Sequence, residues 1–465
     1  MRIEDTDLER SDPKFEEDIK DSLNWLGLEW DEFYKQSERL DIYKKHLQKL
    51  LDEGKAFYCY HTVEELKKEN EEQIKRKEAP RHVCEHKYKK SDKTDGGIIR
   101  LKVDENSTKV IHFNDIIRGT IEWEEKLIGD LSLAKSLKVP LYNFAVVIDD
   151  YETKISHIIR GEDHISNTPK QILIQEALGI KPPQYAHLPL ILGPDRTKLS
   201  KRHGAESVQE YKDMGYMSEA MINFMALLGW RPNEKSRLAK RVEDPRFRRA
   251  KSGPEDIYFI DELISLFDLK DVQKSPAVFD VKKLNWMNGY YIHQLPPEQF
   301  RAAIIPFIIK EVGVNGVHPV KSAKGGAAEQ QFNGVKDEYL DKIQHLMTER
   351  MEKLSDVKNF DYFFKEPKYD RGLLNWKNMP ADEIKKSLTL TKEAIEPIDW
   401  DIFDKDYIRK KLDDLAKENF SGDRGTVYWP LRVALTGKEG SPDPIDLLSV
   451  LPKETVLKRI KIAIE

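Results

Sequence analysis

Cysteine is nearly missing from this sequence, since its 465 residues include only Cys59 and Cys84. Two cysteines cannot build a disulfide-stabilised scaffold, and because both lie within residues 59–84 they direct attention to metal binding. Long apolar runs are also missing, as none approaches the about 20 residues that a membrane-spanning helix needs. No charge sign dominates: 77 basic and 82 acidic residues leave a net charge of -5, so any nucleic-acid binding must be local.

The remaining composition is that of a folded, soluble chain. Hydrophobic residues make up 39% and charged residues 34%, with a mean hydropathy of -0.64, which excludes both a membrane protein and a disordered one. The length predicts about three or four compact units. The first residues, MRIEDTDLER, have neither the apolar centre of a signal peptide nor the acid-poor composition of a transit peptide, so we expect a cytoplasmic protein.

Two helices are predicted near the start of the chain. The first begins at Asp12 and Pro13 and ends at Gly27. Its apolar residues fall on one face: Phe15, Ile19, Leu23 and Leu26. The second is expected to be capped by Ser37 and stopped by Gly54. Its apolar stripe consists of Leu40, Tyr43, Leu47, Leu50 and Leu51.

The middle of the chain changes character twice. Residues 57–140 mix the Cys/His stretch with a charged helix and strand-like runs, and we interpret them as an inserted module. Two β-branched runs, 143–150 and 155–161, then predict strands buried in a parallel sheet. A helix that begins at residues 167–169 follows, and this alternation of strand and helix indicates an α/β fold.

Helices are predicted to dominate after about residue 205. Two segments, 236–253 and 313–335, interrupt them, because they are rich in loop residues and lack apolar periodicity. We interpret both as loops or insertions. The sequence shows no internal repeat.

The run from Lys198 to Arg202, KLSKR, is the most specific short motif. Lys198 and Lys201 lie three positions apart with Ser200 between them, on a segment bounded by glycine and proline. Two ammonium groups and nearby backbone N–H groups can hold a polyphosphate, which suits charge that develops on a pyrophosphate leaving group. A solvated basic turn is the alternative that the motif alone leaves open.

Arg160 ends a predicted strand just before a predicted helix. Ligands bind at this place in open α/β sheets, and an arginine there can hold a carboxylate through two parallel hydrogen bonds. The alternative is a structural ion pair between Arg160 and Asp163.

Two Cys-x-His pairs form the metal candidate: Cys59 with His61, and Cys84 with His86. Two thiolates and two imidazoles are a common structural zinc set. The spacing within each pair is tighter than in a typical zinc finger, so ordinary polar residues at a domain edge remain an alternative.

Segments along the whole chain resemble one family. RIEDTD, YKQSER, PLYNFAVVIDD, HIIRGEDHISNTPKQ, HLPLILGPDRTKLSKRHG, VFDVKKLNWMNGYYI and WPLRVALTGKEGSPDP together are similar to motifs of bacterial-type glutamyl-tRNA synthetases, which are class I enzymes. The resemblance implies a glutamate–tRNA ligase that acts in two steps. ATP and L-glutamate give glutamyl-adenylate and pyrophosphate, and a terminal ribose hydroxyl of tRNA(Glu) then takes the glutamyl group.

The resemblance also implies a role for individual residues. Lys198, Ser200, Lys201 and Arg202 match the catalytic signature loop, in which Lys201 contacts ATP and stabilises the leaving pyrophosphate. The glutamate and adenylate site is matched by Glu4, Tyr142, Arg160, Asp163 and His164. Asp7 matches a position near the tRNA end, and Arg350 matches one that reads an anticodon base. An arginine on an exposed helix face is the alternative for Arg350.

The implied fold is an α/β Rossmann-like class I catalytic domain with an α+β insertion, followed by all-α C-terminal domains. Its parts are 1–56 and 141–205 for the catalytic domain, 57–140 for an acceptor-binding insertion, 206–300 for a helical stem-contact domain and 301–465 for a helical anticodon domain. The implied cofactors are ATP with Mg²⁺, and Zn²⁺ on Cys59, His61, Cys84 and His86, which match ligand positions that many members carry. We expect a monomer that does not bind membranes.

The resemblance fails at the start of the chain, where RIEDTD begins at residue 2. The family places a strand and a His-Ile-Gly-His-like segment before it, which contacts ATP. We therefore expect the first strand to be missing and the chain as written to form the adenylate poorly. A nondiscriminating enzyme that also charges tRNA(Gln) and a catalytically impaired tRNA-binding paralogue are the rival interpretations.

Overall fold

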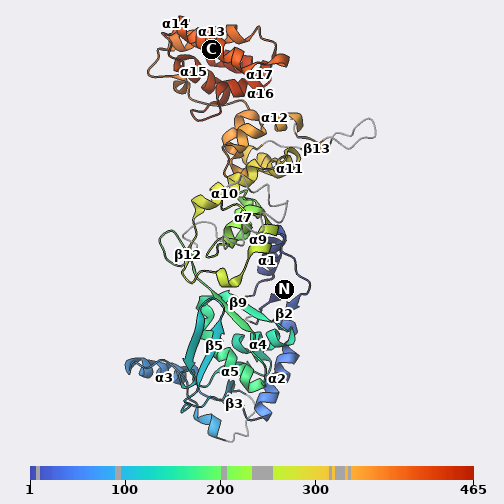
Figure 1. Cartoon of the computed structure of the whole chain (residues 1–465), viewed down its shortest axis with the longest axis vertical. Helices are drawn as coiled ribbons and strands as arrows, with labels where there is room; N and C mark the ends of the chain where they lie inside the picture. The colour runs from blue at the N-terminus through green and yellow to red at the C-terminus, as the bar shows by residue number, and fades with distance from the viewer. Residues whose placement is uncertain are drawn as a thin grey trace. The chain divides into compact units, whose positions relative to one another are not determined.

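Two units, each with its own core, make up the computed structural model of this chain (Figure 1). The first consists of Met1–Gln209 and Met221–Asp280, and the second of Glu210–Ala220 and Val281–Glu465. The structure describes residues 1–6, 11–89, 96–200, 207–232, 255–313, 317–319, 330–332 and 337–465.

A four-stranded sheet forms the centre of the first unit, with the strand order β6-β5-β10-β9. The parallel strands are β5 (Val110–Asp115), β10 (Gln184–Leu188) and β9 (His157–Gly161), and β6 (Gly119–Glu124) pairs antiparallel with β5. The strand predicted at 155–161 is thus confirmed. The pairing also joins β5, a strand of the expected 57–140 insertion, to the sheet that carries Arg160.

Helices α4 (Tyr142–Glu152) and α5 (Thr168–Leu178) pack on each other beside this sheet. The helix predicted after residue 167 is confirmed, and Gly179 ends it with a positive φ of 71°. The prediction of a strand at 143–150 is wrong, because those residues belong to α4. Six consecutive residues of α4, from Phe144 to Asp149, are buried, and a helix that is buried on all sides shows the same uninterrupted apolar run as a buried strand.

A second four-stranded sheet is entirely antiparallel, with the order β3-β4-β7-β8. Its strands are β3 (Ala56–Cys59), β4 (Ile98–Leu101), β7 (Ser132–Ser136) and β8 (Val139–Pro140). Between β3 and β4, helix α3 (Val63–Lys75) is fixed at its start by a reciprocal capping box between Thr62 and Glu65.

The N-terminal elements follow the predicted helix pattern with two differences. β1 (Arg2–Ile3) pairs parallel with β2 (Tyr34–Lys35), α1 spans Pro13–Trp25, and α2 spans Leu40–Asp52. Ser37 does not cap α2, because it lies in a short turn and its hydroxyl donates to Asp5 Oδ2 at 2.6 Å; Arg39 occupies the cap position.

The apolar face of α1 is the second difference. Phe15 is 63% exposed and Ile19 is 45% exposed, and α1 has no buried residue. The two N-terminal residues of this face are therefore exposed, whereas Leu26, which follows the helix, is buried.

In the first unit, β11 (Ile191–Leu192) pairs parallel with β12 (Ala277–Val278), and α9 spans Ile260–Leu266. Two helices, α6 (Val208–Asp213) and α7 (Ser218–Ala226), each cross a sequence boundary between the two units.

The described part of the second unit is helical around one apolar core, as predicted, apart from one short strand pair. Its helices are α10 (Val281–His293), α11 (Pro297–Phe307), α12 (Asp337–Thr348), α13 (Ala381–Ile395), α14 (Lys405–Asn419), α15 (Gly425–Thr436), α16 (Pro444–Val450) and α17 (Lys453–Ile464). The exception lies within the segment 313–335, interpreted above as a loop or insertion, where β13 (Val317–Pro319) pairs antiparallel with β14 (Gln330–Phe332). Residues 236–253 lie outside the described residues.

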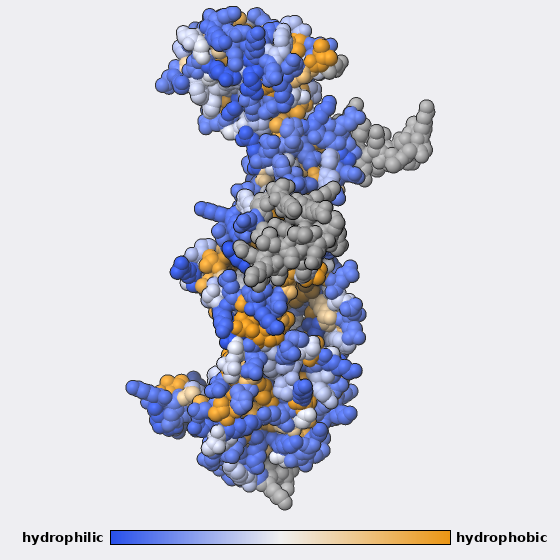
Figure 2. Space-filling view, in the orientation of Figure 1, coloured by the Kyte–Doolittle hydropathy of each residue, from blue (hydrophilic) through white to orange (hydrophobic). Residues whose placement is uncertain are grey.

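Hydrophilic residues predominate on the molecular face drawn in Figure 2, and hydrophobic ones gather in small separate patches. Among the described helices, none has both the length and the apolar character needed to cross a membrane.

Candidate active site and metal centre

A pocket of about 690 Å³ lies in the first unit, next to the N-terminal residues of the chain. β1, β9 and α4 contribute to its lining, and it brings together three residues that the sequence analysis assigned to one substrate site: Glu4, Tyr142 and Arg160. The wider lining contains carboxylates, two arginines and aromatic rings. Such a mixture of apolar surface and a few charged groups is typical of a site for a small polar ligand.

Arg2 forms a second cationic group in this pocket. Its Nη2 lies 2.8 Å from Glu4 Oε1, and its Nη1 lies 2.7 Å from Asp150 Oδ1. Burial raises the pKa of Asp150, and the charge of Arg2 opposes that rise. Sequence analysis missed Arg2, although a basic residue two positions before Glu4 was available as a signal.

Arg160 is held by side chains from two neighbouring elements. Its Nε donates to His187 Nε2 at 3.2 Å, and its Nη2 donates to Thr168 Oγ1 at 2.8 Å and to Gln171 Oε1 at 2.9 Å. These bonds use three of the five N–H groups of a guanidinium. The sequence predicts two parallel hydrogen bonds from Arg160 to a carboxylate. Such a pair would have to displace one of the three partners, because the observed bonds use Nε and both N–H groups of Nη2 and leave out only Nη1.

Asp163 does not pair with Arg160. Its Oδ2 lies 3.4 Å from Lys198 Nζ, so the structural ion pair that we considered is replaced by one with the KLSKR segment. Burial works against the charged form of Asp163, but Lys198 holds its pKa below the usual value. Both side chains are exposed, so this pair contributes little to stability.

Tyr142 lines the same pocket, and His164 lies next to it. The phenol oxygen is 3.4 Å from His164 Nδ1, which also lies 3.3 Å from Asn167 Nδ2. Burial raises the pKa of Tyr142, Glu4 adds to this rise, and Arg160 opposes it. The phenol is therefore a neutral hydrogen-bonding group at neutral pH.

The start of the KLSKR segment follows a tight turn. Gly193 N donates to Thr197 O at 2.8 Å, and Leu199 N donates to Ile191 O at 3.0 Å. This turn places Lys198 beside Asp163, which is three positions from Arg160. Lys201 and Arg202 lie outside the described residues, as does Asp7, and Ser200 is the last described residue of the segment.

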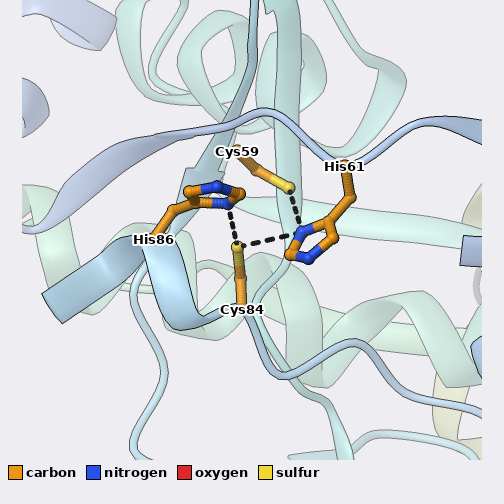
Figure 3. A group of neighbouring side chains, drawn as sticks. All are labelled: Cys59, His61, Cys84 and His86. Atoms are coloured by element: carbon orange, nitrogen blue, oxygen red, sulfur yellow. Dashed lines mark hydrogen bonds between the residues drawn. The ribbon is translucent and has the colours of Figure 1, made fainter. Parts of the chain in front are cut away.

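The four predicted metal ligands form one cluster (Figure 3). Cys59 ends β3, His61 follows it, and Cys84 and His86 come from the chain segment that lies against this strand end. One potential ligand atom from each side chain lies within 4.8 Å of the other three. His61 Nδ1 is 3.5 Å from both sulfur atoms, and both cysteines are buried.

The chemistry of this donor set fits a dication. The hydrogen bond with Cys84 lowers the pKa of Cys59, whereas Cys59 and burial raise the pKa of Cys84. A dication allows both to ionise, and two thiolates with two imidazoles suit zinc.

His82 was missed by the sequence analysis. Its Nε2 lies 3.5 Å from Cys59 Sγ, and its Nδ1 lies 2.6 Å from Glu69 Oε2. Burial disfavours the charged imidazole, but Cys59 and Glu69 raise the pKa of His82 above its usual value. A histidine two positions before Cys84 was the signal that could have found it.

Arg350 lies just after the end of α12, and its side chain is exposed. Its backbone N–H donates to Met347 O at 3.0 Å, which forms the turn that ends the helix. An exposed guanidinium at this position is accessible to a ligand.

Comparisons with known proteins cover the whole chain. A family model for the catalytic domain of class I tRNA synthetases (E and Q) matches residues 1–286, and one for an anticodon binding domain matches residues 305–464. The glutamate–tRNA ligase of Aquifex aeolicus is 41% identical over 475 residues, which cover 99% of this chain and 90% of that protein. That of Carboxydothermus hydrogenoformans is 39% identical over 478 residues, with coverage of 99% and 91%.

Solved structures agree with these sequence comparisons. The crystal structure of a glutamate tRNA ligase from Elizabethkingia meningosepticum, in complex with its amino acid, has a TM-score of 0.79 and 30% identity to this chain. It covers 100% of this chain, which spans 91% of that structure. The chain therefore belongs to the glutamate–tRNA ligase family of the class I aminoacyl-tRNA synthetases.

Proposed function

We propose that this chain attaches L-glutamate to tRNA(Glu) in two steps that use the pocket around Arg160. In the first, an oxygen of the glutamate α-carboxylate bonds to the α-phosphorus of ATP as the bond to pyrophosphate breaks. In the second, a terminal ribose hydroxyl of the tRNA bonds to the glutamyl carbonyl carbon, and AMP leaves. The observation that carries the proposal is that Glu4, Tyr142 and Arg160 line one pocket.

Catalysis in this proposal is mainly positioning and charge stabilisation, because ATP itself activates the carboxylate. Lys201 and Arg202 stabilise the charge on the departing pyrophosphate, Ser200 contributes a hydroxyl donor, and Mg²⁺ accompanies ATP. The position of Lys198 beside Asp163 supports this role, since it brings the start of the segment close to the strand end that carries Arg160.

Selection of glutamate is assigned to Arg160. It favours a negatively charged ligand, and the neutral amide of glutamine would leave its guanidinium without a partner charge, whereas Arg2 is already paired with Glu4 and Asp150. Asp163 and His164 border the bound substrate, and the hydroxyl of Tyr142 supplies a neutral donor.

We propose that Cys59, His61, Cys84 and His86 hold a structural Zn²⁺. The metal neutralises the two thiolates and ties the end of β3 to the segment at residues 84–86, so it supports the fold of the acceptor-binding part. Metal analysis of the purified chain should give about one zinc per chain. A content well below that value would contradict the zinc proposal and leave the proposed reaction untouched.

Three parts of the chain are proposed to contact tRNA. Asp7 contacts the acceptor end, Arg350 reads an anticodon base, and residues 301–465 form the anticodon-binding part of a monomer that works in the cytoplasm. The exposure of Arg350 after α12 supports its role. Charging assays with tRNA(Glu) and tRNA(Gln) decide between this enzyme and a nondiscriminating one, which would charge both.

Ligand binding tests the pocket directly. Calorimetry with sulfamoyl analogues of glutamyl- and glutaminyl-adenylate should show at least about tenfold tighter binding of the glutamyl compound, a difference of about 1.4 kcal/mol. Equal affinity for the two compounds, or no binding of either, would contradict the proposed function. Transfer of labelled glutamate to tRNA(Glu) is the matching activity assay.

A further inference from the structure

A buried carboxylate–imidazole pair lies behind Arg160. His187 on β10 is fully buried, and its Nδ1 lies 2.7 Å from Oδ2 of Asp115, which ends the neighbouring strand β5 and is 3% exposed. In the register of β9 and β10, His187 is the direct partner of Arg160. The three residues therefore lie on adjacent strands of one sheet, in the order Asp115, His187, Arg160.

The geometry fixes the tautomer of His187. Arg160 Nε can only donate, so the bond that it makes at 3.2 Å requires a lone pair on His187 Nε2. The proton of the neutral imidazole must then be on Nδ1, where it donates to Asp115. Burial lowers the pKa of His187, and Asp115 opposes that effect, which keeps the ring neutral at pH 7.

The other oxygen of Asp115 is fully committed to the backbone. Oδ1 accepts N–H groups from Ile117 at 3.0 Å, Arg118 at 2.8 Å and His187 at 3.2 Å. The orientation of the carboxylate is therefore fixed, and only Oδ2 is directed at the imidazole.

The pair acts on one edge of the guanidinium. His187 holds Nε, and Thr168 and Gln171 hold Nη2, so the plane of Arg160 is set. Its guanidinium lines the pocket together with Tyr142, whose hydroxyl is within hydrogen-bonding reach of it. Gln171 is itself oriented by donating from Nε2 to Asn143 Oδ1 at 3.1 Å. Thr168 Oγ1 also lies 3.1 Å from His187 Nε2, so it joins the imidazole and the guanidinium on the same side of the network.

We propose that Asp115 and His187 are positioning residues that fix the tautomer and plane through which Arg160 presents its guanidinium to a substrate carboxylate. This inference rests on the proposed function of the pocket. If Asp115 and His187 were only structural, their role would be to join β5 to β10. Backbone pairing between Tyr185 and Asp115 already joins these two strands. The network instead continues to a residue that lines the pocket.

Asp115→Asn is the sharpest test because it preserves shape and changes one atom. The three backbone N–H groups require an oxygen at Oδ1, so the amide nitrogen of Asn must face His187 Nδ1. The imidazole then has to move its proton to Nε2, where Thr168 Oγ1 at 3.1 Å can accept it, and the Nε–H of Arg160 loses its acceptor. His187→Gln keeps an acceptor for Arg160 but has no link to Asp115.

Binding of the glutamyl sulfamoyl analogue is measured by calorimetry for the full chain and these variants. We expect Asp115→Asn to weaken binding at least about tenfold, His187→Gln to lose less, and the melting temperatures of both to stay close to that of the wild type. His112→Gln, a change at an exposed histidine on β5, is the matched control and should bind as the wild type does.

Nitrogen-15 NMR of the imidazoles and of the arginine Nε groups supplies a readout that does not depend on glutamate. The wild type should show His187 protonated on Nδ1, and Asp115→Asn should shift both this pattern and the Nε–H signal of Arg160. An Nε2–H tautomer in the wild type, an unmoved Arg160 signal, or unchanged ligand affinity in Asp115→Asn would overturn the inference. The Nδ1–H tautomer together with a wild type that binds no glutamyl compound would instead contradict the proposed function alone.

Discussion

The candidate substrate pocket and the Cys/His cluster are completed in different ways. Around Arg160, the protein itself supplies the partners of Nε and Nη2, through His187, Thr168 and Gln171. In the cluster, two sulfurs and two imidazoles face one another, and their ligand atoms all lie within 4.8 Å of one another. The guanidinium of the pocket is therefore held by protein partners, whereas the cluster is a donor set compatible with a metal ion.

Removing one sulfur should give the largest effect and break the cluster alone. Cys84→Ser is expected to reduce the zinc content from about one per chain to near zero, because three ligands cannot close a tetrahedral structural site. Limited proteolysis should then cut residues 59–89 faster, since the metal no longer ties the two segments. Plasma mass spectrometry and protease digestion measure both effects, and a zinc content like that of the wild type would contradict the ligand assignment.

Replacing the guanidinium should break the pocket alone. Arg160→Lys keeps the charge but cannot satisfy His187, Thr168 and Gln171 together, so we expect binding of the glutamyl analogue to fall about 100-fold, or about 3 kcal/mol. Zinc content should not change. Calorimetry measures the loss, with Lys170→Arg on α5 as a control for charge-conserving substitution; affinity within about twofold of the wild type would contradict the assigned role of Arg160.

A smaller change sharpens the comparison from the metal side. Glu69→Gln weakens the orientation of His82, which lies beside Cys59 Sγ, so zinc affinity should fall by about tenfold without loss of the site. Competition with a chromophoric chelator measures this affinity. Glu71→Gln on the same helix is the control, because Glu71 is exposed. Equal losses in both variants would mean that the effect is one of net charge.

The smallest expected effect is a pH dependence of the free energy of unfolding, caused by His187 next to the pocket. Because burial lowers the pKa of His187 in the folded chain, the unfolded chain binds more protons below the ordinary histidine value. The free energy of unfolding should therefore fall as the pH drops below about 6.5, by no more than about 1.4 kcal/mol per pH unit. Denaturant titrations of wild type and His187→Gln between pH 7 and 5 measure the slope, which the variant should lose; an identical slope would contradict this source.

Sequence spacing could predict the cluster but only part of the pocket. Cys59, His61, Cys84 and His86 lie within a short stretch, so their proximity follows from local chain geometry. The supports of Arg160 come from β5, β10 and α5, and only the strand order brings Asp115 and His187 behind it. A single sequence carries no signal for such long-range pairing.

The sequence predicted some helices and strands correctly and others wrongly, because only some of them leave a local pattern. α5 was predicted because Thr168, Pro169 and Gly179 mark its ends. Residues 143–150 predict a strand because their apolar run is uninterrupted; in α4 residues 144–149 are all buried, and full burial removes the apolar periodicity that distinguishes a helix. The two-residue strands β1 and β2 are too short to leave any pattern.

The membership of β5 in the central sheet has a consequence for chimeric enzymes. A graft that exchanged residues 57–140 for those of another protein would also exchange Asp115, and a native Arg160 would then rest on a foreign neighbour. A junction placed before Val110 would keep β5 with its own sheet and transfer only what precedes it. Substrate affinity in such hybrids would then report on the position of the junction as much as on the donor of the graft.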